Sequence, residues 1–330
     1  MRRRDVVGLA LSGCGFTLKS AEAQVTPGRV YRVGLLCARR VGREDSDGKA
    51  FVEELARLGF VEGKNLRLMW AGDVWRNAVE LRQAADELVA LKVDVITTWC
   101  GTPGAQAAKQ ATLSIPVVFS SSADPVTLGL VESLGRPGGN VTGFTGRDSD
   151  MVAKSLEMLV QAVPSIKRVA ILHHSSTRGL PWFQVFESSL PATGRALGVR
   201  TEFVDVPDAA GLDPVITRLA QQGFNGLVFL SGNLTPPGFM ELGQAIASKN
   251  RLPFTGSLEL GALVRVSADD TAKPLRVARY AAKILGGARP ADLPVDQPTA
   301  IKLRINLKAA QALGISIPQA LLLRADEVIR

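Results

Sequence analysis

Short runs of β-branched and apolar residues alternate with helix-period patterns along this chain, and no other feature constrains its fold as strongly. In the first half, strand-like segments fall at 31–36, 65–69, 93–97, 115–120 and 140–143, and further helical segments are expected at 103–111 and 125–134. Between the first two strands, Phe51, Leu55 and Leu58 have helical spacing. Because parallel strands need a crossover, this alternation predicts a parallel sheet covered by helices on both faces.

The same alternation of strand and helix patterns begins again after a helical segment at 151–162. Strands are expected at 169–172, 200–204, 226–230 and 252–254, with helices at 182–197, 212–222 and 239–249. The predicted fold class is therefore α/β, with two doubly wound parallel-sheet lobes, which suits a chain of 330 residues. We assign residues 29–144 and 257–290 to lobe 1, and residues 145–256 and 291–330 to lobe 2. Since ligands bind beyond the carboxyl ends of such strands, we expect a ligand cleft between the lobes.

The first 23 residues have the pattern of an export signal. Three arginines at 2–4 precede an apolar run at 6–11, and small residues follow up to Ala23. Cleavage there leaves Gln24 first and predicts a soluble periplasmic protein. The arginines also fit a twin-arginine signal, so the export route stays open. A lipoprotein-like box ending at Cys14 offers the alternative of a lipid-anchored form, and an uncleaved N-terminus is the third reading.

Composition excludes several classes of protein. With 46% hydrophobic and 21% charged residues the chain is not disordered, and its net charge of +8 is scattered and not gathered in a basic helix. We therefore expect no nucleic-acid partner. Three cysteines cannot form a disulfide framework, and two adjacent histidines cannot alone hold a metal. We expect no metal and no cofactor, and beyond the N-terminus no apolar run is long enough to span a membrane.

The turn after the third strand carries the first candidate site. Thr98, Trp99, Gly101 and Thr102 lie where a helix begins, with Thr102 as its expected N-cap and Pro103 in its first position. The positive end of a helix dipole attracts anions, so a ligand carboxylate is expected here. An ordinary helix start is the alternative. Neither a Walker loop nor a dinucleotide fingerprint is present, which argues against nucleotide binding.

The ends of the next two strands supply further candidates. The hydroxyls of Ser121 and Ser122 are expected to contact the ligand, whereas Asp124 either accepts from an ammonium group or caps the next helix. The capping role is favoured for Asp124. Phe144 and Thr145 are expected contacts at the end of the following strand, with Phe144 joining Trp99 as an aromatic wall. Trp182 is expected to be packing.

Three candidates come from the second half of the chain, namely His174, Asn233 and Ser257. His173 and His174 lie beside serines, but adjacent strand residues point to opposite faces and no G-x-S-x-G elbow exists. We therefore predict no catalytic residues. The protein is not expected to be an enzyme.

Two cysteines follow strands that are neighbours in the usual order 2-1-3-4-5. Cys37 follows the first strand and Cys100 the third. In an oxidising compartment they can form a disulfide. Only a narrow range of Cα–Cα distances allows one, so two free thiols are the favoured expectation.

Several longer phrases of the mature chain are characteristic. They are Leu-Gly-Phe-Val-Glu-Gly-Lys-Asn at 58–65, Leu-Lys-Val-Asp-Val-Ile at 91–96, Ala-Ala-Lys-Gln-Ala-Thr at 107–112, Ile-Pro-Val-Val-Phe at 115–119, Arg-Pro-Gly-Gly-Asn-Val-Thr-Gly at 136–143, Asp-Pro-Val at 124–126 and Leu-Leu-Leu-Arg-Ala-Asp-Glu-Val-Ile at 321–329. With these phrases the chain resembles the ABC-transporter substrate-binding proteins of the tryptophan-transporter-like group, which have the type I periplasmic-binding-protein fold. It departs from the family pattern in a shorter stretch between Phe254 and Tyr280 and in lacking a Tyr-Gly pair near 266–267.

The resemblance implies capture of a small solute between two closing lobes, delivery to an ABC permease in the membrane, and no chemistry on the solute. A monomer is expected. The predicted anion site and apolar surfaces favour an amino acid or related carboxylate, and four tryptophans and two tyrosines are few for a sugar site. Two alternatives stay open: a sensor that reports to a membrane receptor, and, less favoured, an exported hydrolase on the same fold.

Overall fold

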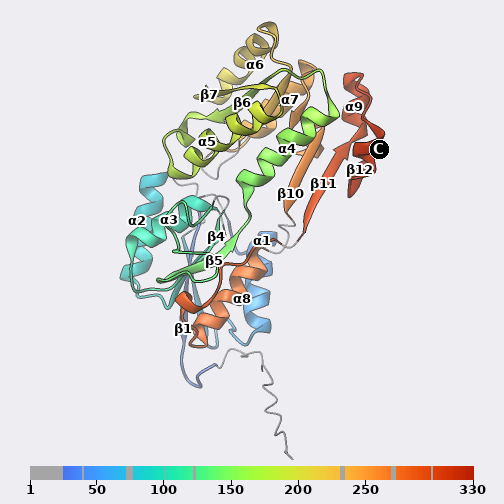
Figure 1. The fold of residues 1–330 in the computed structure, drawn as a ribbon. Coiled ribbons are helices and arrows are strands. Elements are labelled where there is room, and N and C mark those ends of the chain that lie inside the picture. Colours follow the sequence, from blue (N-terminus) through green and yellow to red (C-terminus); the bar gives the residue numbers. More distant parts are fainter. Residues whose placement is uncertain are drawn as a thin grey trace, which may run out of the picture.

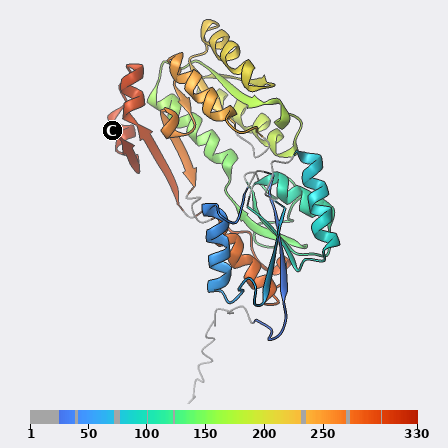
Figure 2. The ribbon, with the colours of Figure 1, turned by 180° about the vertical axis from the view of Figure 1, so that it is seen from behind.

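The computed structural model describes residues 25–38, 41–71, 77–99, 101–121, 124–230, 235–268, 273–298 and 300–330. These residues form two α/β lobes, each built on its own sheet (Figures 1 and 2). The first lobe is the lower one in Figure 1, and the upper lobe carries the C-terminus. The predicted fold class, two α/β lobes with parallel-sheet cores, is confirmed.

The first lobe has a five-stranded, fully parallel sheet in the order β2-β1-β3-β4-β5. Its strands are β1 (Tyr31–Leu36), β2 (Leu66–Ala71), β3 (Val95–Thr98), β4 (Val117–Ser121) and β5 (Val141–Thr145). Its helices are α1 (Ser46–Arg57), α2 (Ala78–Ala90), α3 (Thr102–Ala111) and α8 (Lys273–Leu285). Leu35 packs with the side chains of α1 and α8, and its neighbour Leu36 with those of α2 and α3. The alternation of strand side chains thus builds one core on each face.

The second lobe has a seven-stranded sheet in the order β12-β11-β10-β9-β8-β6-β7. Its strands are β6 (Arg168–His174), β7 (Arg200–Val206), β8 (Gly226–Phe229), β9 (Phe254–Thr255), β10 (Val264–Ala268), β11 (Ile301–Asn306) and β12 (Glu327–Ile329). Its helices are α4 (Asp148–Ala162), α5 (Pro181–Ala196), α6 (Leu212–Gln221), α7 (Phe239–Lys249), α9 (Leu307–Leu313) and α10 (Gln319–Leu322). This sheet also has one core on each face: Ile171 packs with α4 and α5, and its neighbour Leu172 packs with α6 and α7. Short 3₁₀ turns lie at Ser175–Thr177, Ala209–Gly211, Leu258–Leu260 and Pro290–Asp292.

The lobe boundaries differ from those expected. Strand β10 pairs with β9 and β11, so the chain leaves the second lobe after Ala268 and not near residue 257. It returns to the second lobe only after Asp296, which pairs with Phe144 beside β5, and not near residue 291. Both boundaries depend on pairing between segments distant in the sequence, which a local pattern does not contain.

Two further details were not predicted. Residues 125–134, expected to be a short helix, form successive turns, and the Lys109 ammonium donates to the Leu130 carbonyl oxygen (3.0 Å) within them. Strand β11 runs antiparallel to β10, so the second sheet is mixed at that edge. Mixed edges of this kind are common in large α/β sheets.

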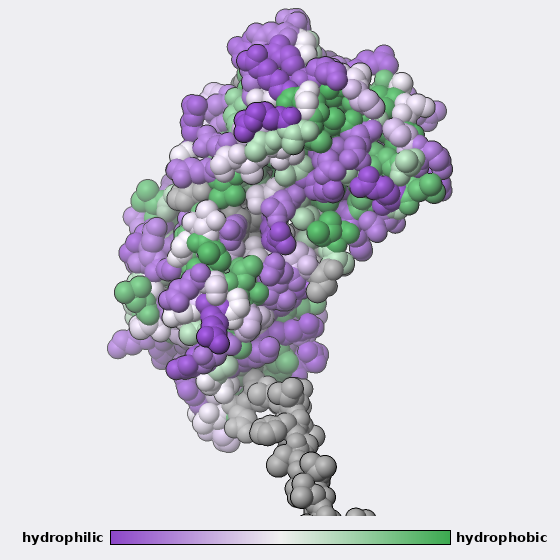
Figure 3. Space-filling view, viewed as in Figure 1, coloured by the Kyte–Doolittle hydropathy of each residue, from purple (hydrophilic) through white to green (hydrophobic). Residues whose placement is uncertain are grey.

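No helix in the described part of the chain has both the length and the apolar character needed to cross a bilayer. On the face shown in Figure 3, hydrophilic residues cover most of both lobes, with hydrophobic ones scattered among them. The large apolar side chains are mostly buried in the cores of the two lobes.

Candidate functional site

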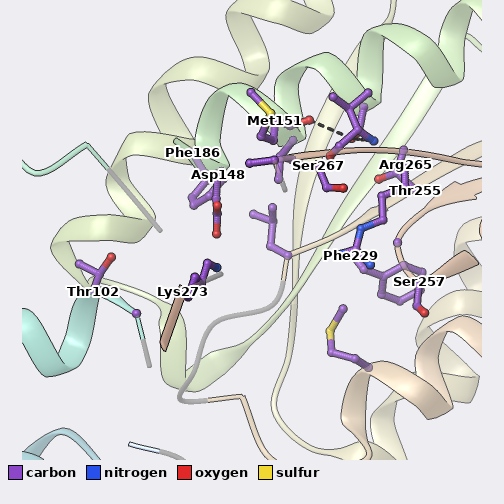
Figure 4. Close-up of a pocket in the computed structure, with 18 of the residues that line it drawn as sticks. Thr102, Asp148, Met151, Phe186, Phe229, Thr255, Ser257, Arg265, Ser267 and Lys273 are labelled. Atoms are coloured by element: carbon purple, nitrogen blue, oxygen red, sulfur yellow. Dashed lines mark hydrogen bonds between the residues drawn. The ribbon is translucent and has the colours of Figure 1, made fainter. Parts of the chain in front are cut away.

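A cleft of about 670 Å³ lies between the two lobes. The first lobe lines it with the end of β3 and the start of α3, and the second with α4, α5, α7 and the ends of β8, β9 and β10. Figure 4 shows this lining, with Thr102 on one side and Arg265, Thr255 and Ser257 on the other. The volume falls within the range of small-molecule sites.

The turn between β3 and α3 is built tightly against the sheet. Gly101 is the N-cap of α3 with φ of 84°, a left-handed conformation that favours glycine. A Cβ on Gly104 would lie 2.3 Å from the Thr98 hydroxyl oxygen, so only glycine lets the helix start sit on the strand end. Thr102 is thus the first helical residue and not the cap, and Pro103 follows it. The positive end of the α3 dipole lies at the cleft.

Aromatic side chains line the cleft from both lobes. Trp99 is 4% exposed and packs against Phe51, with ring centroids 4.6 Å apart. From α5, Trp182 and Phe186 line the opposite side with their centroids 6.1 Å apart. Trp182, expected only to be packing, therefore also lines the cleft. The indole nitrogens of Trp99 and Trp182 are buried without a hydrogen-bond partner among the described residues.

The segment after β9 and the helices α4 and α7 give the second-lobe wall several of its polar groups. The Ser257 N–H donates to the Gln244 side-chain oxygen (2.9 Å), and its hydroxyl donates to the Glu259 carboxylate. The Ser155 hydroxyl accepts from the Val266 N–H (2.9 Å) and thereby ties α4 to β10. Ser257, a predicted contact, therefore does line the cleft.

Charged side chains in the cleft were missed by the sequence analysis. The charged residues that line it are Asp47, Asp148, Glu241, Arg265 and Lys273. Asp148 lies in the first turn of α4, and Lys273 is the first residue of α8. One signal was available: the apolar/polar alternation of 264–268 predicts a half-buried strand with Arg265 and Ser267 on the same, less buried face.

Phe144 and Thr145, both predicted contacts, lie outside this lining. The Arg276 guanidinium lies 4.7 Å over the Phe144 ring, and Phe144 is 1% exposed, so it is packed and forms no ligand wall. Thr145 is buried, donates its N–H to the Asp296 carbonyl oxygen (3.0 Å) and accepts from the Arg147 N–H (3.3 Å). Both residues build the connection between the lobes.

Asp124 and His174 also have local structural partners and do not line the cleft. Asp124 accepts from the Val126 N–H (3.0 Å) and the Thr127 hydroxyl (2.8 Å), so it has a structural role, as favoured, but it closes a turn and does not cap a helix. The Nδ1 atom of His174 accepts from the Ser176 N–H (3.1 Å), and its ring packs on Phe239. His174 therefore caps a turn. No residue of β6 is among those that line the cleft.

The neighbouring His173 is buried against Phe183, with ring centroids 4.4 Å apart. Burial lowers the pKa of this imidazole. The imidazole ring is therefore held neutral inside the second lobe.

Some predicted residues cannot be placed in the site. Ser122, Asn233 and Cys100 lie outside the described residues, and Ser121 is described only as part of β4. Cys37 is disulfide-bonded, so the favoured expectation of a free thiol is wrong at this position. Cys37 is fully buried at the end of β1, next to the Trp99 cluster.

Comparisons with known proteins agree with this geometry. The model of one family, described as ABC transporter substrate binding protein, matches residues 44–329. A tyrosine-binding protein of Clostridioides difficile (strain R20291) is 25% identical over 290 residues, which is 86% of this chain and 81% of that protein.

Two solved structures extend the similarity over most of the fold. A conserved domain protein from Vibrio cholerae matches with a TM-score of 0.78 and 26% identity over 91% of this chain and all of that one. An ABC domain from Streptococcus pneumonia in complex with L-Trp matches with a TM-score of 0.76 and 25% identity over the same shares. Together the matches confirm the resemblance seen in the sequence.

Proposed function

The chain belongs to the family of ABC transporter substrate binding proteins, and we propose that it captures an amino acid or related carboxylate with an apolar or aromatic side chain. The solute is held in the cleft between the lobes and delivered to an ABC permease in the membrane. The protein performs no reaction on it. A single chain suffices, because the cleft is lined by both lobes of one molecule.

The observation that carries this proposal is the mixed lining of the cleft. Trp99 from the first lobe and Trp182 and Phe186 from the second offer apolar surface to a side chain. The start of α3 and the side chain of Arg265 offer positive charge to a carboxylate. Acids such as Asp148 lie in the same cleft, where an α-ammonium group needs a partner. The lining therefore suits a small zwitterion with an apolar body.

The relatives support the same class of solute. One is a tyrosine-binding protein, and another was solved with L-Trp. Both are about one quarter identical to this chain, so we extend to it the class of aromatic or apolar amino acids and no single member.

The proposed location is extracytoplasmic. Residues 1–23 lie outside the described structure, and we propose that they are removed on export to leave Gln24 first. Intact-mass analysis of the periplasmic fraction should give the mass of a chain starting at Gln24. A diacylglyceryl group on Cys14 would show the lipid-anchored form instead.

A thermal-shift panel tests the solute class. Ligand-stripped protein is heated with the common amino acids, aromatic acids, sugars and nucleosides. A bound solute stabilises the fold by RT ln(1 + [L]/Kd), about 2.7 kcal/mol at 100 times Kd. We expect a dose-dependent rise in melting temperature with one or more apolar or aromatic amino acids. A rise with a sugar or nucleoside alone would contradict the proposal.

A further inference from the structure

Arg265 occupies an unusual place in strand β10. Val264, Val266 and Ala268 are buried, whereas Arg265 and Ser267 alternate with them on the other, half-buried face. Arg265 and Ser267 line the cleft, as do Val266 and Ala268 at this end of the strand. In Figure 4 the Arg265 side chain leaves its strand near Thr255 and runs toward the Phe229 ring. Arg265 is therefore a half-buried cation at the wall of the ligand cleft.

The sheet gives Arg265 an unfavourable neighbour. In the antiparallel β10–β11 pair it stands directly opposite Arg304, and like charges in this relation are destabilising. Arg304 lies within 3.9 Å of the Glu327 carboxylate, which offsets its charge. Among the described residues, the Arg265 side chain has no hydrogen bond and no ion pair within 4.0 Å, although its backbone is paired with β11. The Glu259 carboxylate is bonded to the Ser257 hydroxyl, which lowers its pKa, and the charges of Arg304 and Arg265 lower that pKa further. The fold thus carries a cation at the cleft whose guanidinium donors are not taken up by a carboxylate of the described chain.

The lobes would remove water from this guanidinium when they enclose a solute. A cation that loses water without gaining a hydrogen-bonded anion is costly, so a carboxylate on the solute would stabilise it. The guanidinium fork matches the two oxygens of a carboxylate. Hydrogen bonds to a charged group contribute roughly tenfold to a hundredfold in affinity, and a helix dipole contributes about twofold to thirtyfold. Arg265 offers a full charge and two parallel donors, which the α3 start does not, so we take it as the anchor.

We propose that Arg265 binds the carboxylate of the solute and makes the cleft selective for acids over their neutral analogues. This inference rests on the proposed function and deepens it. It places the anionic end of the solute at the second lobe and leaves the Trp99 side for the apolar body.

The test compares acids with their amides, which keep the shape and lose the charge. L-tryptophan, L-tyrosine, L-phenylalanine and L-leucine, each with its primary amide, are titrated calorimetrically into ligand-stripped wild type, R265Q and the matched control R304Q. Wild type and R304Q should bind at least one acid at least tenfold more tightly than its amide. R265Q should lose at least tenfold in affinity for the acid while the amide changes little. Its ligand-free melting temperature should stay level or rise, since a like-charge pair is removed.

The outcomes separate the two ideas. If R265Q keeps the preference of wild type for the acid, this inference is wrong and the proposed function stands. If wild type binds none of the four acids, and a sugar or nucleoside instead, both are wrong. Should R265Q not fold, R265K replaces it: a lysine keeps the charge and loses the fork, so an unchanged acid-to-amide ratio in R265K overturns the bidentate contact.

Discussion

The Arg276 guanidinium donates to the Asp296 carboxylate across 2.7 Å and thereby joins two of the segments at which the chain passes between the lobes. Its cation also lies 4.7 Å over the ring of Phe144, in the strand that leads into the third such segment. Arg276 follows the passage into the first lobe, and Asp296 precedes the passage out of it. One side chain therefore ties together all three connections on the first-lobe side.

Replacing Arg276 with alanine should loosen this junction. We expect the free energy of unfolding to fall by about 1–2 kcal/mol, because a cation–π contact and a partly exposed ion pair are lost together. Urea unfolding followed by circular dichroism measures the change. The control is Arg289→Ala, which removes an exposed pair with Asp292 and should change nothing measurable. Equal effects of the two variants would contradict the special role of Arg276.

The pH dependence of stability should report on Glu54. This carboxylate is 6% exposed and accepts from Arg57 (2.8 Å) and from Arg279 of α8 (2.6 Å). Hydrogen bonds from Arg57, followed by those from Arg279, lower the pKa of Glu54 from 4.5 to about 2. A lowered folded-state pKa gives stability that is present above pH 4.5 and is lost as the pH falls toward 2.

Glu54→Gln should remove that part of the pH dependence. We expect wild type to lose about 1–2 kcal/mol more than Glu54→Gln between pH 6 and pH 2.5, less than the full linkage value, because both arginines are more than half exposed and screened. Urea unfolding of both proteins at the two pH values measures this difference in the free energy of unfolding. Parallel losses in both proteins would mean that other carboxylates account for the acid sensitivity.

The disulfide at Cys37 gives a third prediction. A chain that begins at Gln24 retains only Cys37 and Cys100, so the exported protein should contain no free thiol. Alkylation with iodoacetamide in denaturant, without reductant, should add no mass. Cys37→Ser should lower the free energy of unfolding by about 2–4 kcal/mol. Two alkylated cysteines before reduction would rule out the disulfide in the exported protein.

Local patterns in the sequence were enough to predict the lobes and one half of the site. The β3–α3 turn was predicted because a strand end, a glycine and a helix start follow one another within a few residues, and Trp99 and Thr102 do line the cleft. Arg265 was missed because β10 joins the second sheet by pairing with β9 and with β11, and the residues of β11 lie far along the chain. His174 and Phe144 were predicted as contacts because strand alternation gives a face and does not give the distance to the cleft.

The central claim is that the cleft between the lobes is the binding site. Ser267→Trp places a large side chain in this cleft beside Arg265, whereas Leu113→Trp adds one on the surface of the first lobe, where Leu113 is 86% exposed. The measurement is calorimetric titration of both variants and wild type with the amino acid that the thermal-shift panel identifies. We predict micromolar or tighter binding, about 8 kcal/mol or more, to wild type and Leu113→Trp, and no detectable binding to a folded Ser267→Trp. Unchanged affinity in Ser267→Trp would show that the solute binds elsewhere.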